Sequence, residues 1–383
     1  MIILNILNYS PDFGGGIAQH LSALGRVTKI NGHTLLIGFP KKRNWQTELE
    51  TNSKVIIIPE IENPLRSGFP KVLREICEQN KVDVVHFHFS FPVPFSLAVS
   101  FKGFNLPVIF HWHNPPKSLI NFFTPENTLQ GKIIRFISGL VARIADRRVI
   151  NRHISMSREI SHLLVKNRWT DEDKITFLPN GVSINVSDNR IKITKTTSVP
   201  VIGTVSNFRP QKDHATLIEA FSILCKSGID SELWLVGDGP TKPGMEKLVK
   251  DLGIESKVRF WGTISHPAEM YHQFSIFALS THYEGHPLVI LEAMSYGLPI
   301  VATRISSIPE TIAHEVNGLL VNPNDPQDLA QALQNLIENN ALARRLGDAG
   351  RKFVKQQPTA KDWANHLIEL YEQLELEYKR KIT

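Results

Sequence analysis

The hydrophobic positions of this chain fall into short apolar runs that alternate with longer segments in which apolar residues recur at helical spacing. This alternation predicts parallel β-strands joined by crossover helices. In the first half, the predicted strands are Ile2–Leu7, Thr34–Phe39, Val55–Ile58, Val82–His88, Pro107–Trp112, His153–Met156 and Ile175–Leu178. Helical patterns lie between most of them, including Ile17–Ile30, Lys71–Gln79 and Arg158–Asn167.

The second half repeats the alternation after Val186–Val199, a polar stretch without a long apolar run that we interpret as a linker. The predicted strands are Val201–Val205, Leu233–Val236, Val258–Trp261, Ile276–Ser280, Ile300–Thr303 and Gly318–Val321. The predicted helices include His214–Lys226, Met245–Leu252, Pro287–Tyr296, Pro326–Asn339, Leu342–Lys355 and the long amphipathic pattern Ala360–Lys381.

These patterns predict an α/β protein of two doubly wound, Rossmann-like domains that face each other across a cleft. We place the first domain at residues 1–195, the second at 196–361 and a final helix at 362–383. A length of 383 residues suits two domains better than one. Ligands of doubly wound sheets bind outside the carboxyl ends of the strands, so the loops that follow strands are where we look for chemistry.

The charge is unevenly distributed between the two halves. Residues 1–198 carry 25 Lys and Arg against 15 Asp and Glu, whereas residues 199–383 carry 18 against 22. A basic first half suits an anionic lipid surface or a phosphorylated acceptor, and a solvated basic surface explains it equally well. The basic residues do not alternate with aromatic residues as a stacking platform would, so we expect no nucleic-acid partner.

Three features point to a cytoplasmic protein. No segment reaches the roughly 18 consecutive apolar residues of a membrane span. The opening Met1–Leu7 is typical of a buried strand and not of a signal peptide. Cys77 and Cys225 lie in different halves, which favours two reduced thiols. The basic amphipathic stretch Gly131–Arg148 either contacts the inner face of an anionic membrane or packs its apolar side on the core.

The segment Thr281–Thr303 carries the strongest signal for chemistry. Glu284 follows a predicted strand, and Gly285 allows a ligand to approach the backbone. Pro287 suits the first position of the following helix. The amides at the start of this helix, which include those of His286, Leu288 and Val289, are expected to bind phosphate. Glu292 follows Glu284 with seven residues between them, inside that helix, where its carboxylate can accept a hydrogen bond from a sugar hydroxyl. The spacing alone also fits two unrelated glutamates.

A second motif provides cations after the predicted strand Val201–Val205. Arg209 and Lys212 lie in the strand-to-helix turn, where two positive charges can hold a diphosphate. Without further context, two such residues are more often solvated surface charges.

Glycine-rich turns follow three other predicted strands. Gly237 and Gly239 end one strand, and Gly262 ends the next; the first turn lacks the third glycine of a dinucleotide fingerprint. In the first half, the loop of Gly14, Gly15 and Gly16 precedes a helix and offers bare amides to an anion or a sugar. Plain strand-to-helix turns explain these glycines as well.

Two histidine pairs, His86 with His88 and His111 with His113, lie at the ends of predicted strands. Alternation places both members of a pair on one face of the sheet. A zinc site is conceivable, but no cysteine or carboxylate lies nearby to complete the ligand set, so we expect no metal. Asp171-Glu-Asp173 has the spacing of a metal-binding Asp-x-Asp motif, although an exposed helix end explains it better.

Taken together, these segments resemble the retaining glycosyltransferase family four of the GT-B class, most strongly from Ile202 to Val321. In that family, two glutamates at the spacing of Glu284 and Glu292 contact the donor sugar and the nucleotide ribose. The resemblance implies these two roles here. His286 stands where the family usually has Phe or another apolar residue, which leaves the donor sugar open.

The resemblance also implies roles for the other motifs. Arg209 and Lys212 would hold the departing diphosphate, although Asp213 replaces the glycine that usually follows the lysine. Gly237 and Gly239 would lie beneath the nucleotide, Gly262 beside the base, and the Gly14–Gly16 loop near donor phosphate and acceptor. His113 resembles the active-site histidine that touches the donor sugar near its 6-hydroxyl; His111, on the same face, remains the alternative.

The implied activity is transfer of a hexosyl unit, with retention, from a UDP- or GDP-sugar to an acceptor hydroxyl in polysaccharide, glycolipid or glycoconjugate biosynthesis. The nucleotide diphosphate sugar is a co-substrate, and no cofactor or metal is expected. The acceptor is a glycan, a lipid-linked molecule or a small molecule, read by loops such as Asn114–Asn127. The alternatives are a sugar-nucleotide epimerase on the same fold and a non-catalytic sugar- or lipid-binding protein.

Overall fold

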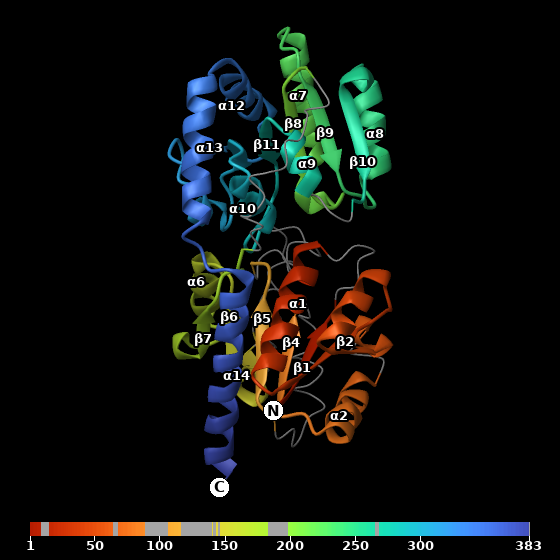
Figure 1. The fold of residues 1–383 in the computed structure, drawn as a ribbon, viewed down its shortest axis with the longest axis vertical. Coiled ribbons are helices and arrows are strands. Elements are labelled where there is room, and N and C mark those ends of the chain that lie inside the picture. The colour runs from red at the N-terminus through yellow and green to blue at the C-terminus, as the bar shows by residue number, and fades with distance from the viewer. Residues whose placement is uncertain are drawn as a thin grey trace. The chain divides into compact units, whose positions relative to one another are not determined.

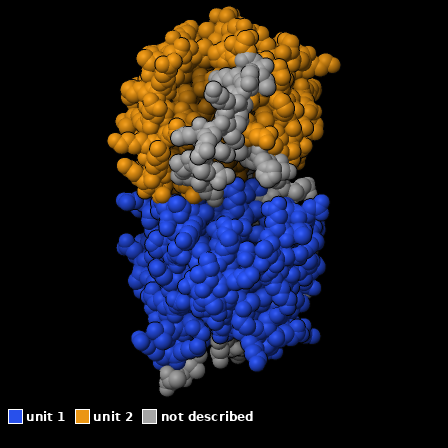
Figure 2. Space-filling view, viewed as in Figure 1, with its two compact units in different colours: residues 1–181, 358–383 blue, residues 182–357 orange. Residues whose placement is uncertain are grey.

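The structure is a computed structural model that describes residues 1–8, 15–63, 68–88, 106–115, 140, 143–144, 146–182, 198–264 and 268–382. Gly14, the 116–127 part of the predicted acceptor loop, most of the stretch 131–148 and the linker from 186 to 197 lie outside the described residues. The chain divides into two compact units, coloured separately in Figure 2. Unit 1 comprises Met1–Gly181 and Pro358–Thr383, and unit 2 comprises Val182–Gln357.

Unit 1 is built on a seven-stranded parallel sheet with the strand order β3-β2-β1-β4-β5-β6-β7 (Figure 1). The strands are β1 (Ile2–Leu7), β2 (Thr34–Phe39), β3 (Lys54–Ile57), β4 (Val84–His88), β5 (Val108–Trp112), β6 (Arg152–Ser155) and β7 (Ile175–Phe177). The helices include α1 (Gly15–Ile30), α2 (Phe69–Asn80), α6 (Arg158–Lys166) and α14 (Ala360–Ile382). The central strands β4 and β5 are buried throughout and β1 is buried from Ile3 onward, because helices cover both faces of the sheet.

Unit 2 contains a six-stranded parallel sheet with the order β10-β9-β8-β11-β12-β13. The strands are β8 (Val201–Val205), β9 (Glu232–Val236), β10 (Val258–Gly262), β11 (Ile276–Leu279), β12 (Ile300–Thr303) and β13 (Leu319–Val321). The helices include α7 (His214–Lys226), α8 (Lys242–Asp251), α9 (Ala268–Gln273), α10 (Leu288–Ser295), α11 (Ile308–Thr311), α12 (Pro326–Glu338) and α13 (Asn340–Val354). Apolar residues on the two faces form two separate core clusters.

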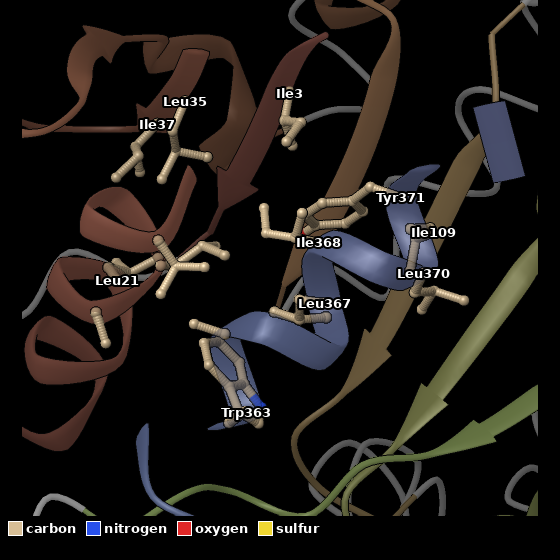
Figure 3. Packing of buried hydrophobic residues seen from close by; sticks show 14 of the residues in the cluster. Ile3, Leu21, Leu35, Ile37, Ile109, Trp363, Leu367, Ile368, Leu370 and Tyr371 are labelled. Atoms are coloured by element: carbon tan, nitrogen blue, oxygen red, sulfur yellow. The ribbon is translucent and has the colours of Figure 1, made fainter. Parts of the chain in front are cut away.

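The C-terminal helix α14 packs against α1 and the sheet of unit 1 (Figure 3). Trp363, Leu367 and Tyr371 are fully buried there among Ile3, Leu21 and other apolar residues of the cluster. A segment more than three hundred residues from the N-terminus therefore completes the core of the first sheet.

The predicted strands are all confirmed, with ends that differ by no more than two residues from the observed ones. The short helices α9 and α11 were not predicted, because six and four residues are too few for a helical pattern of apolar residues to repeat. The prediction for Pro287 was wrong in detail. Pro287 has an extended backbone and caps α10, which begins at Leu288. In the described part of the chain, no helix is long and apolar enough to cross a membrane.

Candidate active site

In the sheet of unit 2, the chain builds outward in one direction from β8 to β9 and β10 and in the other from β11 to β13. The loops that follow β8 and β11 therefore leave neighbouring strands toward opposite faces and open a crevice at their carboxyl ends. The two strongest sequence motifs occupy these two loops: Arg209 and Lys212 follow β8, and Glu284 follows β11.

The structure brings Lys212 and Glu284 together. Lys212 Nζ donates a hydrogen bond to Glu284 Oε1 at 2.5 Å, and Thr281 Oγ1 lies 3.1 Å from the same oxygen. The Glu284 side chain is only 7% exposed and that of Lys212 18%. A carboxylate withdrawn from water to this extent needs a counterion, and Lys212 provides it.

Hydrogen bonds to backbone carbonyls hold the two loops together around this ion pair. Gln211 Nε2 donates to the carbonyl of Tyr283 at 2.7 Å, and the amide of His282 donates to the carbonyl of Gln211 at 2.8 Å. Burial and the charge of Glu284 raise the pKa of Tyr283, while the guanidinium of Arg209 acts in the opposite direction. Arg209 itself is exposed at the start of the turn. The site therefore presents one paired and one exposed cation to a ligand.

Asp213 occupies a position that only a few residue types tolerate. Its backbone is left-handed, with φ of 43° and ψ of 50°, and its carboxylate caps α7 by accepting from the Thr216 amide at 3.4 Å. The Thr216 hydroxyl donates to the other carboxylate oxygen at 2.6 Å. Glycine adopts this conformation freely, and Asp is among the residues that adopt it at low cost. The replacement of the usual glycine by Asp213 thus keeps the turn and adds a helix cap.

Gly237 and Gly239 act through close packing against the turn that carries the cations. Both have positive φ, and an added Cβ would lie 2.0 Å from the carbonyl oxygen of Ser206 or 2.4 Å from that of Phe208. Gly262 also has positive φ, but a Cβ there would meet nothing within 4 Å. The absence of a side chain at the first two glycines therefore lets the backbone just before the Arg209–Lys212 turn pack closely against them. Gly262 lies at the open end of β10.

Helix α10 carries the second glutamate of the motif. Glu292 Oε2 accepts a hydrogen bond from the Tyr271 hydroxyl at 2.7 Å. Burial raises the pKa of the Glu292 carboxyl, and the Tyr271 hydrogen bond partly offsets the rise. His286 is half-buried, and Gly285 and Pro287 are buried beside the start of the helix. Tyr271 thereby orients one carboxylate oxygen of Glu292.

In the sheet of unit 1, the corresponding change of direction lies between β1 and β4. Here the structure places a neutral polar cluster. His88 Nδ1 lies 2.9 Å from His113 Nε2, and His88 Nε2 lies 2.7 Å from Asn5 Oδ1. His86 Nδ1 lies 2.6 Å from the Tyr371 hydroxyl. Burial lowers the pKa of His88 to about 3 and lowers that of His113.

His111 and His113 differ clearly in their surroundings. His111 is 1% exposed, and neither of its ring nitrogens has a hydrogen-bond partner among the described residues. Its ring is stacked against those of His113, His86 and Trp363. His113, just beyond the end of β5, is half-buried and hydrogen-bonded to His88.

The histidine cluster also bears on the question of metal. Ring nitrogens of His86, His88 and His111 lie within 4.8 Å of one another, so three ligands could gather around one ion. Both nitrogens of His88 and one of His86 are, however, already within hydrogen-bond distance of other groups. In the described residues, this arrangement fits a hydrogen-bonded network better than a coordination sphere.

The remaining predicted positions are less informative. Gly15 opens α1 with a positive φ of 51°, and the carbonyl of Gly16 accepts from His20 Nδ1 at 2.8 Å. Asp171 and Asp173 lie in an exposed turn, as expected for a helix end.

Four residues that shape the two crevices were not predicted as site residues from the sequence: Asn5, Thr281, Tyr271 and Tyr371. Asn5 had a detectable signal, since it is the only polar residue in the otherwise apolar strand Ile2–Leu7. Thr281, Tyr271 and Tyr371 had none, because their partners are distant in the sequence or belong to another element.

Comparison with known proteins agrees with this geometry. The description "Glycosyltransferase Family 4" matches residues 14–186, and "Glycosyl transferases group 1" matches residues 185–353. The chain is 27% identical over 292 residues to N-acetyl-alpha-D-glucosaminyl L-malate synthase of Bacillus anthracis, covering 74% of this chain and 73% of that protein. It is 30% identical over 189 residues to the lipopolysaccharide core biosynthesis glycosyltransferase LpsE of Rhizobium meliloti, covering 49% of this chain and about half (54%) of that protein.

Among solved structures, Anabaena HepE in complex with UDP-glucose superposes with a TM-score of 0.77 at 20% identity, covering 97% of this chain and 100% of that chain. The two family descriptions together match both halves of the sequence, and the HepE structure superposes on nearly the whole chain. This chain belongs to the GT-B glycosyltransferases of family four, in which a Glycosyltransferase Family 4 domain precedes a Glycosyl transferases group 1 domain.

Proposed function

We propose that this glycosyltransferase transfers a hexosyl unit, with retention of anomeric configuration, from a nucleotide diphosphate sugar to an acceptor hydroxyl. The observation that carries the proposal is the Lys212–Glu284 pair at the crevice between β8 and β11. A cation and a carboxylate in contact suit a ligand that has a diphosphate at one end and sugar hydroxyls at the other.

The diphosphate would bind to Arg209, Lys212 and the amides at the start of α10. Arg209 is exposed at the start of its turn, and the helix adds the positive end of its dipole. Glu292, oriented by Tyr271, would accept hydrogen bonds from the ribose hydroxyls.

In the structure, Lys212 already has a counterion, so an arriving diphosphate competes with Glu284 for the ammonium group. As Lys212 turns toward phosphate, the carboxylate of Glu284 is released to accept hydrogen bonds from the donor sugar. Binding of the phosphate and binding of the sugar are thereby coupled through a single ion pair.

In the proposed reaction, the bond between the anomeric carbon and the phosphate oxygen breaks, and a bond from the acceptor oxygen to the same face of that carbon forms. The acceptor proton passes to the departing diphosphate. Negative charge grows on the diphosphate as the bond breaks, and Arg209 and Lys212 stabilise it. No divalent metal is required in this scheme.

We assign the contact with the donor sugar in unit 1 to His113 and not to His111. His113 is half-buried and hydrogen-bonded to His88, whereas His111 lies stacked in the core with 1% exposure. A histidine that touches a ligand needs such partial exposure together with a partner that fixes its orientation.

We further propose that the acceptor is presented at the inner face of an anionic membrane, to which the basic first half docks peripherally. The support is the surplus of Lys and Arg in residues 1–198, and the relative LpsE is named for lipopolysaccharide core biosynthesis. Sedimentation with anionic vesicles at low and high salt tests this. Absence of binding at low salt would leave a small soluble acceptor as the better proposal.

The central test is a screen of nucleoside diphosphates for thermal stabilisation, since a specific ligand stabilises the folded state by mass action. UDP is the first compound to try, because HepE was solved with UDP-glucose. The preferred nucleotide then selects the donor sugars for assay, and the anomeric configuration of the product is read by NMR. An inverted product would refute retention, and isomerisation of the donor without an acceptor would indicate an epimerase.

A further inference from the structure

A chain of buried polar groups leads from the C-terminal helix to His113. Asn5, at the centre of β1, is completely buried, and so are His86 and His88 on the neighbouring strand β4. Asn5 Nδ2 donates to the Tyr371 hydroxyl at 3.4 Å, and Asn5 Oδ1 faces His88 Nε2 at 2.7 Å. His88 Nδ1 faces His113 Nε2 at 2.9 Å. Groups withdrawn from water in this way have to satisfy one another.

The direction of each hydrogen bond follows from the first. A carbonyl oxygen only accepts, so His88 Nε2, which faces Asn5 Oδ1, carries the proton of that imidazole. His88 Nδ1 is then the acceptor of the ring, and the bond between the two histidines requires a proton on His113 Nε2. In a neutral His113, the remaining nitrogen, Nδ1, is consequently a hydrogen-bond acceptor.

The other side of Asn5 is consistent with the same orientation of its amide. The Tyr371 hydroxyl has one proton, which it gives to His86 Nδ1 at 2.6 Å while its oxygen accepts from Asn5 Nδ2. One orientation of the Asn5 amide, with Nδ2 donating to Tyr371 and Oδ1 accepting from His88, therefore satisfies the hydrogen bonds on both sides.

We propose that Asn5 and His88 are positioning residues that hold His113 in the tautomer protonated on Nε2, so that its Nδ1 accepts a hydrogen bond from a donor-sugar hydroxyl. This inference rests on the proposed function in one respect only, namely that His113 touches the donor sugar. The tautomer itself is a property of the free protein.

Two further observations agree with a neutral network. Burial lowers the pKa values of His86, His88 and His113, so none of them carries the second proton at neutral pH that would erase the distinction between tautomers. The three strands that supply Asn5, His88 and the residue before His113 are consecutive in the sheet, which keeps the spacing of the chain rigid.

The direct test is 15N NMR of the free protein labelled at histidine, in which the two ring nitrogens of a neutral imidazole give well-separated signals. His113→Gln identifies the His113 signals by their loss. We expect a protonated Nε2 and an unprotonated Nδ1 for both His88 and His113. A protonated Nδ1 on His113 would overturn the proposal, and so would Zn²⁺ binding that shifts the signals of His86, His88 and His111 together.

Variants of Asn5 separate positioning from folding. Asn5→Leu removes the acceptor for His88, and we expect a mixture of His113 tautomers and a loss of roughly ten- to hundred-fold in kcat/KM for the donor, the range known for the hydrogen-bond partners that orient metal-bound histidines. Asn5→Gln keeps a neutral amide whose oxygen can face His88, and it is expected to restore the tautomer and most of the activity.

Thr170→Val is the matched control, because it removes a different buried hydrogen bond in unit 1, from Thr170 Oγ1 to Asp146 at 2.7 Å. It should lower stability without changing the His113 signals or the kinetics of the folded fraction. Unchanged signals in Asn5→Leu would refute the positioning role. The expected mixture of tautomers together with wild-type donor kinetics in Asn5→Leu would refute the sugar contact of His113, while the effects of Lys212 and Glu284 variants would still test the proposed transfer.

Discussion

The two sheets of this protein change direction in the same way, yet the crevices at these points have opposite chemistry. Between β8 and β11, Lys212 and Glu284 form an ion pair beside the exposed Arg209. Between β1 and β4, Asn5 and His88 form a buried network without charge. The fold supplies the position of a site, and the side chains at the strand ends decide which part of a ligand it can hold.

The difference in solvent exposure explains why one crevice is charged and the other is neutral. Lys212 retains 18% of its side-chain exposure, so its charge remains partly hydrated and available to an anion. Asn5 and His88 have no exposure, and a charge there would lack both water and a counterion. The charged crevice therefore suits a diphosphate, and the neutral one suits the orientation of hydroxyl groups.

The largest difference between the units should appear when α14 is removed. Deletion of Asp362–Thr383 takes away Trp363, Leu367 and Tyr371, each of which contributes about 1.5–3 kcal/mol by burial. Their sum is comparable with the whole stability of a domain. We expect insoluble protein or a much lower Tm. Deletion of only Lys379–Thr383, which removes the exposed end of the helix, is the control. A soluble, fully active long truncation would contradict this prediction.

Acid should also affect unit 1 before unit 2. Burial depresses the pKa values of His86, His88 and His111 in the folded protein, whereas the unfolded chain takes up protons near pH 6.5. The unfolded state thus binds more protons, and stability falls as the pH drops below about 6.5 and continues to fall toward the folded pKa values. The slope is about 1.4 kcal/mol per pH unit for each imidazole.

In unit 2, the pKa of His214 is lowered to about 4 and that of Glu292 is raised. As the pH falls, the first shift lowers the free energy of unfolding and the second raises it, so their effects on stability oppose each other. Hydrogen exchange measured at pH 7 and pH 5 should show earlier opening of peptides from unit 1. His111→Leu, which removes an imidazole without a described hydrogen bond, should reduce the difference. Equal acid sensitivity of the two units would contradict the prediction that the buried histidines make unit 1 the more acid-sensitive unit.

Lys212→Ala tests the charged crevice. We expect a loss of roughly 10²–10³-fold in kcat, because the ammonium group stabilises charge that develops on the leaving diphosphate. Lys242→Ala is the matched control, since Lys242 pairs with the exposed Asp238 on the same unit at 3.5 Å. A similar loss in both variants would assign the effect to surface charge in general.

Glu284→Gln should separate binding from turnover. The amide no longer neutralises Lys212, so we expect a nucleoside diphosphate to bind more tightly, by roughly tenfold or about 1.4 kcal/mol, while turnover falls. Glu292→Gln should instead weaken nucleotide binding, because the ribose contact exists before and during the reaction. Calorimetric titration with UDP or GDP measures both. Weaker binding in Glu284→Gln would contradict the competition for Lys212.

The smallest expected effect is that of a chelator. Arg209 and Lys212 take the place of a metal in the proposed site, so transfer measured with excess EDTA should persist within about twofold, far less than the loss expected from removal of an essential charge-stabilising group. Activity that is lost with EDTA and restored by Mn²⁺ would overturn metal independence. The histidine cluster and the carboxylates of Asp171 and Asp173 would then be the candidate metal ligands.

Much of the fold was predictable because its causes are local. Each buried parallel strand is a short apolar run, and each covering helix repeats apolar residues at its own period, so the observed bounds of β1, β2, β8 and β12 coincide with the predicted ones. The loop positions of Arg209, Lys212 and Glu284 followed from the strands before them. Pro287 was misplaced by one residue, because its sequence preference does not decide between capping a helix and beginning it.

The pairings could not be predicted, because they depend on which strands become neighbours. Lys212 meets Glu284 across 72 residues, and Asn5 meets Tyr371 across 366. The residue types and their places at strand ends are written in the sequence. The order of strands in each sheet, set by the burial of apolar faces from distant segments, decides which of those residues touch and which nitrogen of His113 carries the proton.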